Sequence, residues 1–314
     1  MPLERSVFRP FYKPPFNGSA FIAPRILIAK DMIYWNKLLR PRQTKNREGE
    51  GFVFATTGLQ YTNLARRAAR SLKLAMPKAQ IDLFTDQKIE DPIFDEIHPV
   101  THRGPRPKME ALLSSRFEKT IYLDADVVVV EDIADVFDLL DSHPIAAALG
   151  VSRSRTEMTS YRKDIPHAFP VLNSGVFAIR RTPQTLAFLE DWDRNYARSK
   201  IGKDQPVLRA TLYEHQLMPL VLPPEYNLLK QSLLDKWGRI NGGIRCLHVR
   251  ALHDVAHPNT DEPIGLQEVV RPRHLQTMIK AREADHSLKG SSRIYDLPPA
   301  RQRVKPNKTA RIKL

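Results

Sequence analysis

The sequence predicts an α/β domain built on a doubly wound, mostly parallel sheet with helices on both faces. Two observations lead to this fold class. Short runs rich in β-branched and aromatic residues alternate with segments of helical periodicity between residues 51 and 126, and this alternation is typical of parallel sheets. Polar pairs follow two of these strands, at Thr56 and Thr57 and at Asp124 and Asp126. Because parallel sheets bind ligands beyond the carboxyl ends of their strands, both pairs are candidate site residues.

The individual elements follow from local patterns in chain order. The first strand stops at Gly58, and the next helix has apolar residues at Leu64 and Leu72 before Pro77 ends it. A later helix begins after the N-cap residue Thr182, with a proline in its first turn. We predict strands at 51–58, 80–86, 119–126, 144–150, 174–181 and 244–250, and helices at 61–77, 106–117, 182–199 and 203–215.

The charge distribution divides the chain into three parts. The formal net charge of +14 comes from the ends, since residues 1–50 carry +6 and residues 271–314 carry +9, whereas residues 51–270 carry −1. We predict a Pro- and Arg-rich arm at 1–50, one domain at 51–255, and a basic, partly disordered extension at 256–314. Nucleic-acid enzymes usually carry their positive charge on the folded body, so nucleic acid is not the expected partner. Basic ends suit an anionic surface such as acidic lipid or an anionic glycan, and the plain alternative is solvated ends that aid solubility.

Cysteine content and hydropathy indicate the compartment. The chain has one cysteine, Cys246, which excludes an internal disulfide framework and fits a reducing compartment. No apolar stretch is long enough to span a membrane as a helix, and the first residues lack the apolar core of a signal peptide. We expect a cytoplasmic protein, with peripheral membrane contact through the basic ends as a further hypothesis.

Asp124 and Asp126 end the apolar run "KTIYLDAD". Carboxylate oxygens are the ligands that Mg²⁺ and Mn²⁺ prefer, and these cations are often shared with substrate phosphates. The plain structural interpretation is an acidic loop that caps the following helix, and it suits Asp132 and Asp135 better. The two strand-terminal aspartates therefore predict a metal site.

The same string also fits a different class of enzyme. In haloacid-dehalogenase-like phosphatases, an apolar strand ends in Asp-x-Asp, and Asp124 would be the nucleophile and Asp126 a general acid or base. That family opens its fold with this strand and needs a paired acidic motif downstream. Here a predicted strand–helix–strand unit precedes the string, and the later acidic run "EDWD" lies in a predicted helix. The phosphatase is kept as the alternative.

Residues 52–254 resemble glycosyltransferase family 8, the group that contains glycogenin and bacterial galactosyl- and glucosyltransferases. The resemblance rests on six segments that occur in the family's order: "FVFATTGLQYTNL", "RPKMEALLSSRFEKTIYLDAD", "HAFPVLNSGVFAIRR", "KDQPVLRATLY", "LPPEYNLL" and "LHVR". It implies a GT-A-type fold. It also implies an enzyme that moves a hexose from a UDP-sugar to a glycan or another hydroxyl acceptor, with retention of anomeric configuration.

The resemblance assigns nucleotide-binding residues. It implies that Thr56, Thr57 and Tyr61 surround the base, and an aromatic ring that stacks on uracil is physically reasonable. It implies that Lys108 lies near phosphate or sugar, where the plain alternative is a solvated first-turn lysine. Asp124 and the neighbouring Ala125 are expected at the nucleotide.

The resemblance also assigns the sugar and the metal sites. It implies that Asn173, Ser174 and Gly175 face the donor sugar, since a backbone that passes close to a sugar ring favours glycine. It implies that Asp204 and Gln205 bind sugar hydroxyls near the reacting centre and are the catalytic pair, where the plain alternative is an N-cap. The metal, Mn²⁺ or Mg²⁺, is expected on Asp124, Asp126 and His248.

The segment after His248 departs from the family. The family continues with a Gly and then Lys-Pro-Trp, and neither is present in "LHVRALHD". Arg250 or His253 would have to supply the missing cation towards the diphosphate, and the sequence does not choose between them. A third interpretation is a non-catalytic protein that binds through its basic ends and keeps only the fold of a sugar-nucleotide enzyme.

Overall fold

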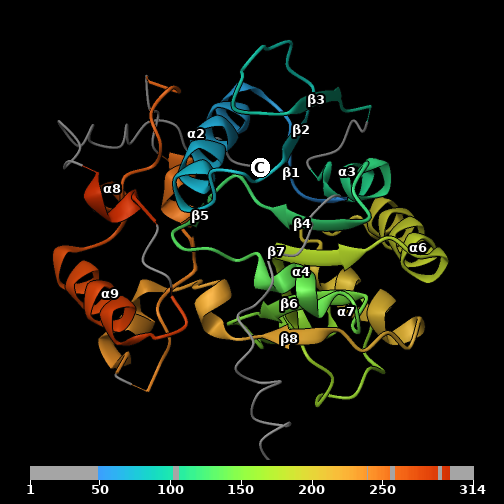
Figure 1. Ribbon diagram of the computed structural model, residues 1–314. Coiled ribbons are helices and arrows are strands. Elements are labelled where there is room, and N and C mark those ends of the chain that lie inside the picture. Colours follow the sequence, from blue (N-terminus) through green and yellow to red (C-terminus); the bar gives the residue numbers. More distant parts are fainter. Residues whose placement is uncertain (1–48, 102–105, 239, 255–258, 289–291, 298–314) are drawn as a thin grey trace, which may run out of the picture. The chain divides into compact units, whose positions relative to one another are not determined.

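The computed structural model describes residues 49–101, 106–238, 240–254, 259–288 and 292–297 (Figure 1). All contacts reported below belong to one compact unit, Glu48–Leu314. The predicted N-terminal arm, and the end of the predicted C-terminal extension, lie almost wholly outside the described residues. Among the helices of the described part, none is both long and apolar enough to cross a membrane.

A seven-stranded sheet forms the centre of this unit, in the order β3–β2–β1–β4–β7–β6–β8. β7 is antiparallel to both of its neighbours, and every other neighbouring pair is parallel. The strands are β1 (Glu50–Thr56), β2 (Ile81–Thr85), β3 (Glu96–Pro99), β4 (Lys119–Leu123), β6 (Ile145–Leu149), β7 (Leu172–Arg180) and β8 (Leu220–Leu222).

Alternating side chains of the central strands fill a core on each face of the sheet. In β1, Phe52 and Phe54 belong to one core, and Val53 and Ala55 belong to the other. A strand that is buried on both faces reads as a continuous apolar run, which is the pattern that predicted it. Gly58 then turns the chain from β1 into the next helix with φ +80°, a conformation that glycine adopts without strain.

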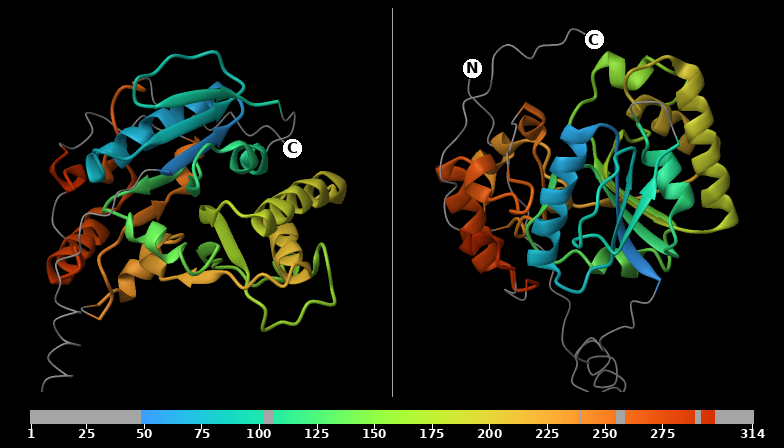
Figure 2. Two further views of the ribbon diagram at one scale, coloured as in Figure 1. Left: turned by 45° about the vertical axis from the view of Figure 1, so that its right-hand side comes forward. Right: turned by 90° about the horizontal axis from the view of Figure 1, so that it is seen from above.

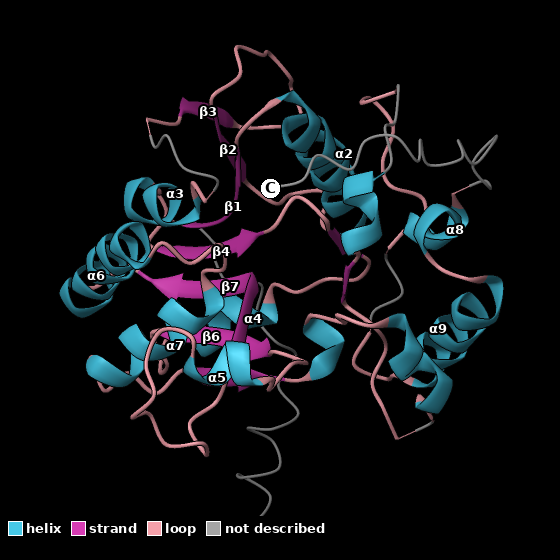
Figure 3. Ribbon diagram, turned by 180° about the vertical axis from the view of Figure 1, so that it is seen from behind, coloured by secondary structure: helices cyan, strands magenta, loops and turns pink. Residues whose placement is uncertain are grey.

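Helices cover both faces of the sheet, as Figures 1 and 3 show from opposite sides. α3, α6 and α7 pack into one core, and α2, α4 and α9 pack into the other. The long helices that the sequence predicts lie within a few residues of their expected bounds, for example α6, which starts at the Thr182 capping box with a proline in its first turn. The helices are α2 (Leu59–Ala75), α3 (Lys108–Ser114), α4 (Asp135–Leu139), α5 (Arg155–Thr159), α6 (Pro183–Ser199), α7 (Gln205–Glu214), α8 (Leu266–Val269) and α9 (Pro272–Ala284).

A second, two-stranded sheet joins distant parts of the chain. β5 (Val127–Val129) pairs antiparallel with β9 (Cys246–His248), and α2 packs against β5. The segment after β9, orange to red in Figure 2, continues on this side of the molecule. Its residues Leu266, Met278 and Ile294 are buried in the same core. Short 3₁₀ turns complete the connections: η1 (Pro224–Tyr226), η2 (Gln231–Lys236), η3 (Arg250–Asp254) and η4 (Ile294–Asp296).

The predicted α/β class, with its doubly wound and mostly parallel sheet, is confirmed. Each predicted strand and helix has a counterpart within a few residues. The strand predicted at 119–126 ends earlier, at Leu123, because Asp124 begins a tight turn in which the Val127 N–H donates to the Asp124 carbonyl at 3.0 Å. The reversed direction of β7 was not predicted, nor were β3, β5, β8 and α9.

Candidate functional site

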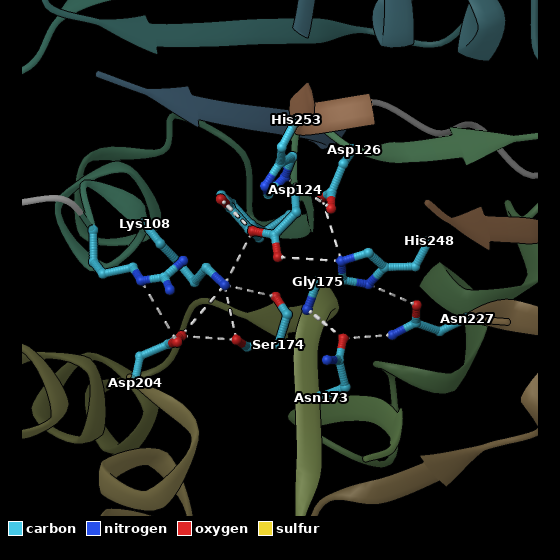
Figure 4. A network of polar contacts seen from close by, with 12 residues as sticks. Lys108, Asp124, Asp126, Asn173, Ser174, Gly175, Asp204, Asn227, His248 and His253 are labelled. Carbon is cyan, nitrogen blue, oxygen red and sulfur yellow. Dashed lines mark hydrogen bonds and ion pairs between the residues drawn. The ribbon is translucent and has the colours of Figure 1, made fainter. Parts of the chain in front are cut away.

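The carboxyl ends of β1 and β4 and the amino end of β7 meet at one edge of the main sheet. β1 ends at Thr56 and β4 ends at Leu123, so Asp124 follows the edge directly. β7 runs in the opposite direction, which brings Asn173, near its start, to the same edge. The Asp124 N–H donates to the Gly175 carbonyl at 2.8 Å. Residues far apart in the sequence therefore form one polar network (Figure 4).

Asp124, Asp126 and His248 converge within this network. The register of β5 and β9 sets His248 opposite Val127. His248 Nε2 lies 3.3 Å from Asp126 Oδ1 and 4.0 Å from Asp124 Oδ2. One potential ligand atom from each of the three residues lies within 4.8 Å of the others. Two carboxylate oxygens and one imidazole nitrogen suit a cation such as Mn²⁺, so the residues present fit the expected metal.

Two asparagines orient the imidazole of His248. Asn227 Nδ2 donates to Asn173 Oδ1 at 2.8 Å, so the Asn227 oxygen is turned to His248 Nδ1, at 3.2 Å. Asn173 Oδ1 also accepts the Gly175 N–H at 2.9 Å, which fixes its own amide. With Nδ1–H bound to Asn227, Nε2 faces the two aspartates, as in metal sites whose imidazoles are held by an outer hydrogen bond.

Gly175 lies directly under His248. A Cβ added to Gly175 would come within 2.3 Å of His248 Cε1 and 2.9 Å of Asn173 Oδ1. The resemblance predicts glycine here because a sugar ring would pass close to the backbone. The contact with His248 gives a reason for glycine that involves only the protein's own side chains.

Lys108 lies between the possible metal ligands Asp124, Asp126 and His248 and the predicted sugar-binding residues Ser174 and Asp204, and contacts both groups. Its side chain is 2% exposed, which rules out the solvated first-turn lysine considered from the sequence. Nζ lies 3.1 Å from Asp124 Oδ1, donates to Ser174 Oγ at 2.8 Å, and lies 3.4 Å from Asp204 Oδ2. Since Ser174 Oγ also donates to Asp204 Oδ2 at 2.9 Å, the lysine and serine share one carboxylate.

Asp204 precedes α7 but does not cap it. Its carboxylate makes no side-chain capping hydrogen bond and turns instead to Lys108 and Ser174. Arg106 Nε lies 3.8 Å from its other oxygen. Gln205 is half-buried at the first position of α7, and none of the contacts described for this part of the chain joins its side chain to the network.

The predicted nucleotide residues are only partly gathered. Thr56 is buried, and its hydroxyl is engaged with Thr62 at 2.9 Å. Thr57 is half-buried beyond the strand end, and Ala125 packs in the apolar core. Tyr61 is 41% exposed and meets His253 edge to face, with ring centroids 5.3 Å apart. Tyr61 is brought towards Asp126, because His253 contacts both residues.

Sequence reasoning missed several members of the network. Tyr122 donates its hydroxyl to Asp124 Oδ1 at 2.9 Å, and Arg106 adds a second positive charge beside Asp204. The sequence assigns no role to Asn227 of "LPPEYNLL", and it does not choose between His253 and Arg250. The alternation of β4 places Tyr122 two residues before Asp124, on the same face, which is the signal that could have found it.

The charges of the network shift the pKa of its members. Burial opposes the ionisation of Asp204, but Lys108 and Arg106 outweigh it, so the Asp204 pKa lies below its usual range. Burial likewise opposes the charged form of His248, but the hydrogen bond and charge of Asp126 raise its pKa. The Asp126 pKa is held low by the imidazoles of His248 and His253, which overcome the effect of burial. A cation that binds His248 must therefore displace a proton.

A second group of possible metal ligands lies at the opposite ends of the parallel strands, where Asp82, Glu96 and His98 approach one another. Arg116 donates two hydrogen bonds to the Asp82 carboxylate, from Nε to Oδ2 at 2.8 Å and from Nη2 to Oδ1 at 3.1 Å. Its Nε also lies 3.2 Å from Glu96 Oε1. This bidentate pair supplies the positive charge that the carboxylates need, and we assign the group a structural role.

Comparison with known proteins finds a similarity over the segment that holds most of the site residues. A model of the family described as nucleotide-diphospho-sugar transferase matches residues 106–259. The nucleotide-sugar transferase resemblance predicted from the sequence is thereby confirmed, whereas family 8 itself stays a prediction. None of the curated proteins matches the chain.

This chain is also similar to several solved structures. The galactosyltransferase LgtC, in complex with donor and acceptor sugar analogs, has 15% sequence identity and a TM-score of 0.45, and the match covers 63% of this chain and 86% of that one. Mouse xyloside xylosyltransferase 1 has 14% identity and a TM-score of 0.46, with 66% of this chain and 100% of that one covered. The glycosyltransferase GlyE of Streptococcus pneumoniae has 18% identity and a TM-score of 0.46, with 63% of this chain and 53% of that one covered.

Proposed function

We propose that this chain, whose residues 106–259 match the nucleotide-diphospho-sugar transferase family, is a metal-dependent glycosyltransferase that moves a hexose from a UDP-sugar to an acceptor hydroxyl. The observation that carries the proposal is the convergence of Asp124, Asp126 and His248 beside Lys108 and Asp204. A carboxylate–imidazole triad next to a buried lysine provides adjoining positions for a cation, a diphosphate and a sugar.

In this proposal, different residues of the chain bind the cation, the diphosphate and the sugar. Asp124, Asp126 and His248 would hold Mn²⁺ or Mg²⁺, which when bound neutralises the diphosphate and so favours its departure. Lys108 adds a fixed positive charge at the same place. Asp204, held ionised by Lys108 and Arg106, offers an acceptor to sugar hydroxyls.

The proposed reaction exchanges one bond at the anomeric carbon. The bond from that carbon to the diphosphate oxygen breaks, and its electron pair leaves on UDP. The acceptor oxygen forms the new glycosidic bond, and its proton passes to the departing diphosphate. We propose that Asn173, Ser174 and Gln205 orient the sugar, and that Tyr61 supports the base. Retention of configuration is part of the proposal because of the family resemblance.

The phosphatase alternative is weakened by where its partners lie. That chemistry requires a second acidic motif against Asp124 and Asp126. The candidate run "EDWD" lies on α6, where Asp191 pairs with His215 at 2.9 Å. The carboxylate that does approach Asp124 through a shared lysine is Asp204, which the phosphatase pattern does not include.

Calorimetric titration of UDP tests the proposal, with Mn²⁺ and again with EDTA. Binding should require Mn²⁺ and should be lost in Asp126→Asn. Asp132→Asn is the matched control, because Asp132 is exposed and Asn keeps the Oδ1 that accepts the Ala134 N–H. If UDP binds equally well in EDTA and in Mn²⁺, and equally well to Asp126→Asn and to the wild type, the proposed metal site is wrong. A screen of UDP-sugars then identifies the donor.

The same variants separate the alternatives. If no UDP binds, hydrolysis of a generic phosphomonoester that survives Asp204→Ala but not Asp124→Asn favours the phosphatase. Salt-dependent nucleic-acid binding without UDP-sugar turnover favours the non-catalytic protein.

Peripheral contact with anionic lipid is a separate hypothesis about the basic ends. Co-sedimentation with phosphatidylserine liposomes tests it, using a chain trimmed of residues 1–48 and 298–314. The trim stops short of 271–297, because this segment contributes Met278 and Ile294 to the core. Co-sedimentation that is unchanged by trimming contradicts the hypothesis, as does the absence of co-sedimentation.

A further inference from the structure

His253 returns to the metal cluster from the turn that follows β9. The turn η3 begins two residues after His248, and the ring of His253 reaches Asp126, with Nε2 3.0 Å from Oδ2. His248 Nε2 contacts the other oxygen, Oδ1, at 3.3 Å. The two imidazoles therefore divide the Asp126 carboxylate between them, one on each oxygen (Figure 4).

One short segment holds Asp126 by its backbone as well. The Val249 N–H donates to the Asp126 carbonyl at 2.8 Å. Together with His248 and His253, this bond leaves Asp126 only 3% exposed. A carboxylate whose second oxygen accepts a hydrogen bond cannot rotate freely, so its first oxygen keeps a defined direction.

The far side of His253 contacts the start of α2. Its ring meets Tyr61 edge to face, with an interplanar angle of 85°, and its carbonyl accepts a hydrogen bond from the Gln60 amide. Tyr61 stays 41% exposed, so part of its ring remains open to a ligand. His253 is thus the residue between the aromatic ring proposed for the base and the carboxylate proposed for the cation.

The geometry distinguishes the two candidates that the sequence left open. Arg250 is exposed, and none of the ion pairs between described residues includes it. His253 is half-buried against Asp126. It does not belong to the group of ligand atoms that lie within 4.8 Å of one another, which comprises Asp124, Asp126 and His248. This placement fits a residue that acts through Asp126 rather than on the cation itself.

We propose that His253 is a positioning residue that fixes the Asp126 carboxylate for the cation and supports Tyr61 for the nucleotide base. The inference rests on the proposed function. By donating Nε2–H to Oδ2, His253 keeps Oδ1 directed towards His248 Nε2, the second atom that would hold the cation. By packing against Tyr61, it ties the first turn of α2 to the same carboxylate, so that base and cation are held by one connected group.

Mn²⁺ binding by the full chain without nucleotide is the first test, read by calorimetry. His253→Ala should weaken Mn²⁺ binding by about 10–100-fold, the usual effect of losing a residue that orients a metal ligand. His253→Gln should recover most of the affinity, because its amide still donates to Oδ2. His143→Ala, which removes an exposed histidine beyond the opposite end of the sheet, should bind like the wild type.

The outcomes separate this inference from the proposed function. Wild-type chain that does not bind Mn²⁺ overturns both. Wild-type binding that is unchanged in His253→Ala overturns the inference alone. Equal loss in His253→Ala and His253→Gln, with unchanged thermal unfolding, overturns the hydrogen-bonding role, because the imidazole itself would then be the requirement.

The link to the nucleotide has its own measurement. UDP affinity at saturating Mn²⁺ is compared for His253→Ala, Tyr61→Ala and the double variant. Residues in direct contact have non-additive effects, so the double variant should lose less than the two single losses combined. Additive losses overturn the link between His253 and Tyr61.

Discussion

At the scale of single residues, Gly175 combines a fixed backbone with a side chain packed directly against it. β7 is paired on both edges, by β4 and β6, so its backbone cannot retreat from His248. Gly175→Ala should displace the His248 ring, destabilise the fold by about 1–3 kcal/mol as overpacking does, and abolish Mn²⁺ binding. Thermal unfolding and Mn²⁺ calorimetry measure the two effects.

A matched glycine provides the control. A Cβ added to Gly238 would meet nothing within 4 Å, so Gly238→Ala should leave both measurements unchanged. If Gly175→Ala binds Mn²⁺ like the wild type, then His248 is not held where the metal site needs it.

Asn227 tests the orientation of the same imidazole from the other side. Asn227→Ala removes the acceptor of His248 Nδ1–H, so the ring loses its defined tautomer. Mn²⁺ affinity should fall by about 10–100-fold. The ¹⁵N shifts of the His248 ring report the tautomer directly, and shifts that match the wild type would contradict this role for Asn227.

The sequence predicted the chemistry of these residues better than their contacts. Asp124 and Asp126 were identifiable because carboxylates at the end of an apolar strand have few structural uses. The sequence assigns Gly175 to a sugar, yet a side chain added there would meet His248 first. The places of Asn227 and His253 depend on the path of irregular chain around β9, and no periodic pattern describes such a path.

At the scale of elements, a buried ion pair attaches α2 to the β2–β3 connection. Asp91 accepts hydrogen bonds from Arg66 Nε at 2.5 Å and from both terminal nitrogens of Arg70 at 2.9 Å. Burial opposes the charged form, but the two arginines lower the Asp91 pKa below its usual value. Asp91→Asn should therefore cost on the order of 2–3 kcal/mol at neutral pH, the value of hydrogen bonds to charged groups.

The pH dependence of this pair has a definite sign. Because the Asp91 pKa is lower in the folded state, the pair stabilises the fold above the unfolded pKa of about 3.9. This contribution disappears as the pH falls through the folded pKa, so the difference between wild type and Asp91→Asn should shrink in acid. Denaturant unfolding across pH measures it, with the exposed, neighbouring Glu90→Gln as control. A difference that is constant with pH contradicts the ion pair.

Strands and helices with a clear apolar pattern or capping signal were predictable from the sequence. Elements whose formation or direction depends on contacts with other parts of the chain were not. β1 and β4 are apolar on both faces, and α6 carries its own capping signals. β3 is a four-residue edge strand with exposed ends, and its sequence alone does not favour a strand. The direction of β7 depends on the connection that precedes it, which contains only the short helix α5.

At the scale of the whole molecule, the segment after residue 259 is part of the main core. Met278 of α9 is fully buried in the core that also contains α2. Met278→Ala should cost about 2–5 kcal/mol of unfolding free energy, and unfolding should remain a single transition because the core is shared. Met218→Ala, at a side chain 70% exposed, is the control. A separate early transition would mean that this segment unfolds independently.

The pairing of β5 with β9 sets Asp126 and His248 side by side, although β6, β7 and β8 of the main sheet lie between them in the sequence. A cation held by both would cross-link the two segments and close that long stretch of chain into a loop. Because the unfolded chain has no such site, the cation would bind only the folded state and stabilise it by mass action. The supply of the ion would then govern how long the folded protein persists, as well as how fast it reacts.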